Sequence, residues 1–368
     1  MPLSARARFA LYAFGLLFWA APPAYAADWQ AGAGADWQKV LSAAKSEGTV
    51  VVTGPPQLGT AFAEQFQKDT GIKVEYLGGE ARATASRVVR EVRAKNVTID
   101  VSLTGSAELP EVKEGLFEDE KARLMLPGVT DLKNWADGKL KFVDNTGQFM
   151  LQTHSYVSSK PYFNPQMVKP EDFKSWRYLL DPKFKGKIVA YDPRAGGPGQ
   201  AMASYIAAQF GIDFLKQLYI GQEVIFSLDS RQMAEWVVRG VYPVALGVLT
   251  PDYQKFLEAG VKTITPAELP DGAGTLSGGF SVIELLKGAP HPNAQTVFLN
   301  WYASEPGQAA FSRAYGVPSL RLDVKVDGIP DYVVPKSGGK YLDQYNEEWM
   351  LTGRAKIQEQ LMQALGGK

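Results

Sequence analysis

A glycine-rich stretch at residues 186–203 has the composition of an anion-binding loop. Its sequence, GKIVAYDPRAGGPGQAMA, joins an apolar strand, an Asp-Pro-Arg turn, two glycines and the start of a helix. A helix N-terminus presents free backbone N–H groups and a positive dipole end to an anion. Arg194 can add a forked, permanently charged guanidinium. The alternative is that Gly196 and Gly197 only allow the chain to turn.

The sequence lacks the usual motifs of catalysis and of nucleotide binding. It contains no G-x-S-x-G or H-E-x-x-H motif, and its two histidines offer few bases for a serine triad. The glycine loop is followed by Gln200 and Ala201, where a P-loop requires lysine and a hydroxyl residue. We therefore predict a binding protein, with no enzymatic activity, no cofactor and no metal site. A secreted hydrolase remains an alternative from another class.

Other loops of small residues are expected at the carboxyl ends of strands. Residues 53–57 follow a β-branched strand at 49–53, and residues 104–107 follow an alternating apolar strand at 97–103. Open α/β sheets bind ligands at these ends of their strands. If two lobes face each other, these loops, the glycine loop and residues 276–279 converge on one cleft between the lobes.

The spacing of apolar residues predicts two successive α/β units. Helices at 36–48 and 83–95 alternate with strands in the first unit, which favours a mostly parallel sheet covered on both faces. A strand at 149–157, which carries His154 and Tyr156, leads towards the second unit. Residues 280–286 form a strand that returns to the first lobe. Met233, Trp236 and Val237 form a helical stripe typical of a buried face, and residues 343–365 supply closing helices.

Residues 1–26 have the features of a cleaved signal peptide. Arg6 and Arg8 precede an apolar run at 9–20 that is too short to span a bilayer, and Ala-Tyr-Ala occupies positions 24–26. The chain contains no cysteine, which excludes disulfides, thiolate metal sites and a lipidated cysteine. We therefore expect a periplasmic protein without a lipid anchor.

Charge and composition predict a globular protein with no affinity for nucleic acid. The chain has 39 basic and 39 acidic residues, and loss of Arg6 and Arg8 leaves 37 against 39, a net charge of −2. Such a balance gives no attraction to nucleic acid or to an anionic membrane. A hydrophobic content of 45% suffices for a sizeable core, and the length favours two domains.

Four segments resemble one known family. They are DWQKVLSAAKSEGTVVV, DVSLTGSAEL, NPQMVKPEDFKSWRYLLDPKFKGKIVAYDPRAGGPG and ELLKGAPHPNAQTVFLNWYASEPGQAAF, of which the last two are the most specific. From Trp37 to about Val324 the chain resembles periplasmic solute-binding proteins of ABC importers, in the branch of ferric-iron, thiamine and phosphonate binders.

The resemblance implies a type II periplasmic-binding-protein fold. Two α/β lobes would be joined by crossover strands and would close on a ligand by a hinge motion. Lobe 1 would comprise residues 27–148 and 273–320, lobe 2 residues 149–272, and residues 321–368 would form C-terminal helices packed on the lobes. The partners implied are an inner-membrane ABC permease and its ATPase subunit, and we expect the protein itself to be a monomer.

The sequence departs from the ferric-iron binders at their metal ligands. In those proteins a histidine follows the first strand, a glutamate follows the DV-type strand, and two tyrosines precede a helix in the second lobe. The aligned positions here are Pro56, Gly105 and the pair Thr250 and Pro251, with Tyr253 nearby. Because trivalent iron needs phenolate and carboxylate oxygens, this loss argues against iron.

The anion-binding half of that family's site is retained. The loop at 194–199 resembles the loop that holds the synergistic anion in iron binders, with an arginine added. We therefore predict a small organic ligand bearing a phosphate, phosphonate or carboxylate, with ferric iron or a thiamine-type ligand as alternatives. The predicted ligand-binding residues are Thr53, Gly54, Gln57, Gly105, Ser106, His154, Tyr156, Arg194, Gly196, Gly197, Tyr253, Ser277 and Gly278.

Overall fold

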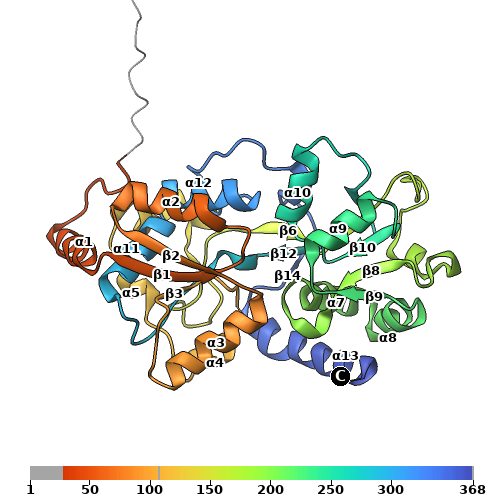
Figure 1. The fold of residues 1–368 in the computed structure, drawn as a ribbon, viewed down its shortest axis with the longest axis horizontal. Helices are drawn as coiled ribbons and strands as arrows, with labels where there is room; N and C mark the ends of the chain where they lie inside the picture. The colour runs from red at the N-terminus through yellow and green to blue at the C-terminus, as the bar shows by residue number, and fades with distance from the viewer. Residues whose placement is uncertain (1–27, 107, 367–368) are drawn as a thin grey trace, which may run out of the picture.

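The protein consists of two α/β lobes joined by short crossover strands (Figure 1). The structure is a computed structural model that describes residues 28–106 and 108–366. The predicted signal peptide at 1–26 lies outside the described residues. The two-lobed α/β class expected from the sequence is confirmed.

Lobe 1 is built on a six-stranded sheet with the order β2-β1-β3-β13-β5-β4. β1, β2 and β3 are parallel, whereas β13 pairs antiparallel with β3 and β5 because it returns from lobe 2. The sheet is therefore mixed rather than mostly parallel. Its strands are β1 (Thr49–Gly54), β2 (Lys73–Gly78), β3 (Val101–Ser102), β4 (Lys141–Phe142), β5 (Leu151–Gln152) and β13 (Val282–Leu285). The helices of this lobe are α1 (Ala35–Glu47), α2 (Gly59–Thr70), α3 (Ala81–Arg93), α4 (Leu109–Val112), α5 (Glu120–Arg123), α6 (Pro127–Thr130), α11 (Pro292–Tyr302) and α12 (Glu305–Tyr315).

Lobe 2 has a five-stranded sheet with the order β11-β7-β10-β8-β9. Its strands are β7 (Pro161–Phe163), β8 (Ile188–Tyr191), β9 (Ile225–Ser227), β10 (Val244–Leu246) and β11 (Thr265–Pro266). Its helices are α7 (Gly197–Phe210), α8 (Ile212–Lys216), α9 (Ser230–Val238) and α10 (Thr250–Glu258). Met233 and Val237 of the predicted stripe are fully buried, as expected.

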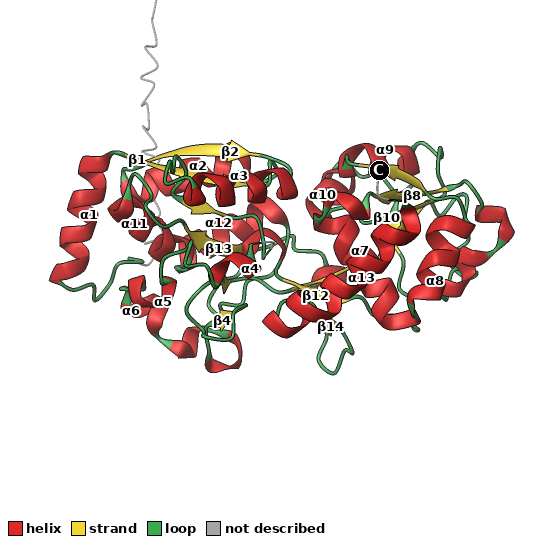
Figure 2. Cartoon of the chain, turned by 90° about the horizontal axis from the view of Figure 1, so that it is seen from below, coloured by secondary structure: helices red, strands yellow, loops and turns green. Residues whose placement is uncertain are grey.

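A three-stranded sheet links the lobes. β6 (Tyr156–Ser158) and β12 (Thr275–Ser277) pair antiparallel, and β14 (Leu342–Asp343) adds to β12. The strand expected at 149–157 is split, because β5 lies in the lobe 1 sheet and only β6 crosses. Two C-terminal helices, η9 (Trp349–Arg354) and α13 (Ala355–Leu365), lie at the junction, at the lower edge of Figure 1 and towards the viewer in Figure 2. Short turns complete the chain: η1 (Leu132–Asn134), η2 (Ala136–Gly138), η3 (Trp176–Leu180), η4 (Pro182–Phe184), η5 (Pro193–Ala195), η6 (Gln217–Gly221), η7 (Gly279–Ser281) and η8 (Asp331–Val333).

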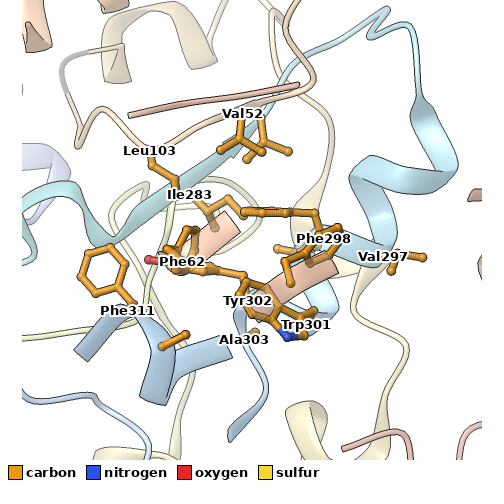
Figure 3. Packing of buried hydrophobic residues seen from close by; sticks show 14 of the residues in the cluster. Val52, Phe62, Leu103, Ile283, Val297, Phe298, Trp301, Tyr302, Ala303 and Phe311 are labelled. Carbon is orange, nitrogen blue, oxygen red and sulfur yellow. The ribbon is translucent and has the colours of Figure 1, made fainter. Parts of the chain in front are cut away.

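An aromatic cluster fixes the helices of lobe 1. Phe62 of α2 packs against Trp301 of α11, with ring centroids 5.3 Å apart, and against Phe311 of α12 (Figure 3). All three side chains are at most 1% exposed. Since aromatic residues bury large apolar areas, this contact joins helices that are far apart in the sequence.

We expect Phe62→Ala to lower the free energy of unfolding by about 3–5 kcal/mol, because it leaves a cavity among rigid aromatic rings. Urea denaturation of the mature protein measures this loss. Leu132→Ala is the control, since Leu132 is 46% exposed and should be almost neutral. Equal effects of the two substitutions would contradict the assignment of this core.

Candidate ligand-binding site

A cavity of about 730 Å³ lies between the two lobes. Lobe 1 contributes α3 and the loop at 104–106, and lobe 2 contributes the glycine loop and the start of α7. The crossover strands and the C-terminal helices form the remaining walls. Such a volume matches a small organic ligand.

The predicted glycine loop forms the N-terminal end of α7. Gly196 and Gly197 both have positive φ angles, of 81° and 55°, which side chains with a Cβ adopt only with strain. These glycines turn the chain from η5 into a helix of 14 residues. Gly196, Gly197, Pro198 and Gln200 line the cavity. The positive end of the α7 dipole therefore lies at the cavity wall.

Arg194 lies at the cavity, but its charge is already paired. Its Nε and Nη2 atoms lie 2.9 Å and 2.7 Å from the two carboxylate oxygens of Asp192. Although burial raises the pKa of Asp192, hydrogen bonds from Arg194 lower it below its ordinary value. The Arg194 carbonyl accepts a hydrogen bond from Arg82 of α3, so this loop also joins the lobes.

Arg354, at the end of η9, contributes a guanidinium that has no counter-ion in the described part of the chain. Its Nη2 donates to Oε1 of Gln200 at 2.7 Å, and its Nη1 lies 3.2 Å from Sδ of Met350. Its Nε is buried and has no hydrogen-bond partner. Among residues 28–106 and 108–366, no carboxylate lies within salt-bridge distance of it. Burial lowers its pKa, because the charged form is poorly solvated here.

Helix α3 adds further arginines on the lobe 1 side. Arg82, Arg90 and Arg93 line the cavity. Arg93 is paired with Glu114 at 2.6 Å, whereas Arg82 and Arg90 form no ion pair among the described residues. The charges that face the cavity are therefore mainly positive.

The acidic side chains at the cavity are held towards their neutral form. Glu108 is 1% exposed, and its Oε1 accepts a hydrogen bond from Thr104 at 2.6 Å. Burial raises the pKa of Glu108 to about 7. Burial and the neighbouring Glu108 also raise the pKa of Glu284, which lies on β13 behind it. These carboxyls offset less of the positive charge than their number suggests.

The structure brings seven of the thirteen predicted residues to this cavity and leaves six elsewhere. Gln57 lines a separate cavity of about 380 Å³, and its Nε2 lies 3.5 Å from Oδ2 of Asp252. Thr53 donates to the carbonyl of Leu77 within the sheet. The seven residues that line the cavity are Gly105, Ser106, Tyr156, Arg194, Gly196, Gly197 and Ser277. The six that do not line it are Gln57, Thr53, Gly54, His154, Tyr253 and Gly278.

His154 is a core residue rather than a cavity residue. It is fully buried, with its two ring nitrogens each 3.0 Å from the hydroxyls of Thr153 and Ser312, and its ring packs on Phe311. Burial lowers the pKa of His154 to about 3, so the ring is neutral. Tyr253 likewise packs between Tyr162 and Tyr332 instead of facing the cavity.

Sequence reasoning missed the C-terminal contribution to the site. Gln344, Tyr345, Met350 and Arg354 all line the cavity. The segment WMLTGRAKIQEQ has only the pattern of an amphipathic helix, so nothing in it marks Arg354 as different from a surface arginine.

Comparison with known proteins identifies the family. The family model for bacterial extracellular solute-binding proteins matches residues 61–332, which is most of the chain. The protein belongs to this family. Its members are the substrate-binding subunits of ABC importers. No helix in the described part of the chain is long and apolar enough to cross a membrane.

Curated relatives differ in the ligands for which they are named. A periplasmic protein of Salmonella typhimurium named for binding 2-aminoethylphosphonate is 26% identical over 267 residues, 71% of this chain and 73% of that protein. Iron uptake protein A1 of Synechocystis is 23% identical over 259 residues, 67% of this chain and 68% of that protein. An uncharacterized protein of Haemophilus influenzae is 31% identical over 144 residues, only 37% of this chain and 38% of that protein.

Solved structures share the fold. AfuA from Actinobacillus pleuropneumoniae, with fructose 6-phosphate bound, superposes with a TM-score of 0.69 at 17% identity, covering 86% of this chain and 97% of AfuA. Iron-bound HitA from Pseudomonas aeruginosa gives a TM-score of 0.64 at 17% identity, covering 84% and 99%. The type II periplasmic-binding-protein fold is therefore confirmed.

We expect Glu108→Gln to stabilise the protein at high pH. The folded state keeps the Glu108 proton up to about pH 7, whereas the unfolded chain releases it near the ordinary pKa of 4.5. The folded state thus binds more protons in this window, and the wild type loses stability as pH rises through it. Urea denaturation near pH 4 and near pH 8 should give a gain only at the higher pH. The exposed Glu75→Gln is the control, and a gain of equal size at both pH values would contradict the burial of Glu108.

Proposed function

We propose that this protein binds a small organic anion, bearing a phosphate, phosphonate or carboxylate group, in the interlobe cavity. The observation that carries the proposal is the charge of that cavity. It combines the N-terminus of α7 with Arg82, Arg90 and Arg354, none of which forms an ion pair among the described residues. The carboxyl of Glu108, at the same cavity, is held towards its neutral form. Such a site favours an oxyanion over a cation.

Two of the similar proteins support this ligand class. One relative is named for 2-aminoethylphosphonate, and the AfuA structure contains fructose 6-phosphate. Both ligands carry a phosphorus oxyanion on a small polar body. The cavity walls also include Tyr156, Ser277 and Ser106, which suit the apolar and hydroxyl parts of such a body.

Ferric iron is the second candidate, because other similar proteins are named for iron. The residues that favour it line the smaller cavity, where Glu80, Asp229 and Asp252 supply carboxylates. Within the described residues, however, no group of three or more histidines, cysteines or acids is placed to hold a metal ion. Pro56 and Pro251 stand at two positions aligned with iron ligands. The organic anion is therefore the better supported ligand.

In the proposed cycle, the exported protein captures its ligand in the periplasm and delivers it to an ABC permease with a separate ATPase. The lobes already meet through Arg82 and the Arg194 carbonyl, and through Gln57 and Asp252. A ligand in the cavity adds contacts to both lobes and so favours the closed arrangement. The protein acts as a monomer and catalyses no reaction.

We expect organic phosphates or phosphonates to stabilise the ligand-stripped mature protein. A thermal-shift panel of 2-aminoethylphosphonate, fructose 6-phosphate, inorganic phosphate, citrate, thiamine and ferric salts tests this. Binding adds about 4 kcal/mol at a thousandfold excess over Kd, which is easily detected. A shift with ferric salts alone, and with none of the anions, would replace this proposal with iron binding.

A further inference from the structure

The C-terminal segment at 342–365, here named the C-terminal strap, connects both lobes across the cavity. On the lobe 1 side, Asp343 pairs with Lys141 at 2.9 Å and Glu347 pairs with Lys113 at 3.2 Å. The lobe 2 side is held by Leu361, which is buried in the core of that lobe. The strap lies beyond residues 61–332, which the family model matches.

Arg354 occupies the middle of the strap, where it faces the start of α7. Gln344 and Gln358 fix the strap on either side, by hydrogen bonds to the carbonyls of Ala201 and Pro193 at 3.1 Å each. Arg354 itself reaches Gln200, which lies in the first turn of α7. The guanidinium and the positive end of the α7 dipole are thus held side by side by backbone-anchored contacts.

The hydrogen-bonding capacity of Arg354 is mostly unused. Nε has no partner, and Nη1 contacts only the thioether of Met350, which is a weak acceptor. Tyr345 lies nearby, but burial raises the pKa of its phenol, so it carries no compensating charge. A poorly solvated guanidinium without an anion is costly, and two adjacent positive groups increase that cost. An anion bound between the Arg354 guanidinium and the N-terminus of α7 would compensate both positive groups.

We infer that Arg354 is the principal anion-binding residue of this protein and that the C-terminal strap is its specificity element. The inference rests on the proposed function and makes it more specific. The oxyanion of a phosphate or phosphonate binds between the Arg354 guanidinium and the N-terminus of α7, and the organic body extends towards Tyr156 and Ser106. Arg194 shapes the glycine loop through Asp192 and contributes less to ligand affinity.

Isothermal titration of the full mature protein with 2-aminoethylphosphonate, fructose 6-phosphate and inorganic phosphate tests this inference. We expect Arg354→Met to weaken the binding of whichever probe the wild type binds by about 30-fold or more, as for a buried charge pair. Arg354→Lys should lose less affinity, because lysine keeps the positive charge but lacks the planar guanidinium with its several N–H donors. Arg194→Ala should lose less than Arg354→Met, because Asp192 already neutralises Arg194. Lys356→Gln, on the exposed face of α13, should bind as the wild type does.

A second measurement separates ligand binding from a structural role. Without ligand, Arg354→Met should have an unfolding temperature equal to or above that of the wild type, because it removes a partly buried charge that has no counter-ion among the described residues. With the probe, the wild type should gain stability and the variant should not. If Arg354 were structural, its loss would instead lower the unfolding temperature of the unliganded protein.

The outcomes distinguish the two proposals. If the wild type binds none of the three probes, this inference fails, because it names a phosphorus oxyanion. The proposed function fails with it only if the wild type does not bind citrate either. If the wild type binds a probe and Arg354→Met binds it equally well, only this inference fails. It also fails if Lys356→Gln loses as much affinity as Arg354→Met, or if Arg194→Ala loses more. If Arg354→Met does not fold, Arg354→Lys takes its place in the test. Wild-type affinity of Arg354→Lys would then contradict the assignment of the guanidinium as the anion-binding group.

Discussion

The hydrophobic interior is divided between the two lobes, and each lobe has two buried clusters. Phe62 and Trp301 belong to the core of lobe 1, while Trp176 and Tyr205 belong to that of lobe 2. Short strands and the C-terminal strap run between the lobes, and hydrogen bonds from Arg82 and Gln57 also join them. Tyr332 packs against buried clusters of both lobes, and beside this contact the lobes face each other across a cavity. The hinge motion implied by the resemblance and the proposed binding site therefore have the same physical origin.

The electrostatics of the cavity follow from where charge is paired. Arg194 and Arg93 have carboxylate partners, so they contribute mainly to local structure. Arg354 has none among the described residues, and the buried carboxyl of Glu108 is held towards its neutral form. The result is a positive site in a protein whose formal charge is zero. Net charge therefore says little about this ligand, because only unpaired groups at the cavity act on it.

The alternating strands and helices, the two lobes and the glycine loop were predictable, because they depend on local patterns. Hydrophobic period, β-branched runs and paired glycines act over a few residues. The split of the expected strand at 149–157 was not predictable in this way. The apolar run of residues 149–157 is continuous in the sequence. In the structure, however, β5 pairs with β4 and β13 in the lobe 1 sheet, whereas β6 pairs with β12 in the linking sheet. The strand is therefore divided by pairing partners, of which β12 and β13 lie far away in the sequence. The burial of His154 follows from that division, since its ring is enclosed by residues of α12.

The fold class, the resemblance to solute-binding proteins and the position of Gly196 and Gly197 at a helix start could all be inferred from the amino-acid sequence alone. These properties rest on local backbone preference and on the order of elements. Which charged side chains have a partner becomes apparent only in the folded chain. Arg194 is paired because Asp192 lies two residues away in the same turn. Arg354 has no ionic partner among the described residues, because the strap places it in the cavity beside Gln200, which is 154 residues away in the sequence. Pairing of charges depends on distances in space, and the sequence does not specify these directly.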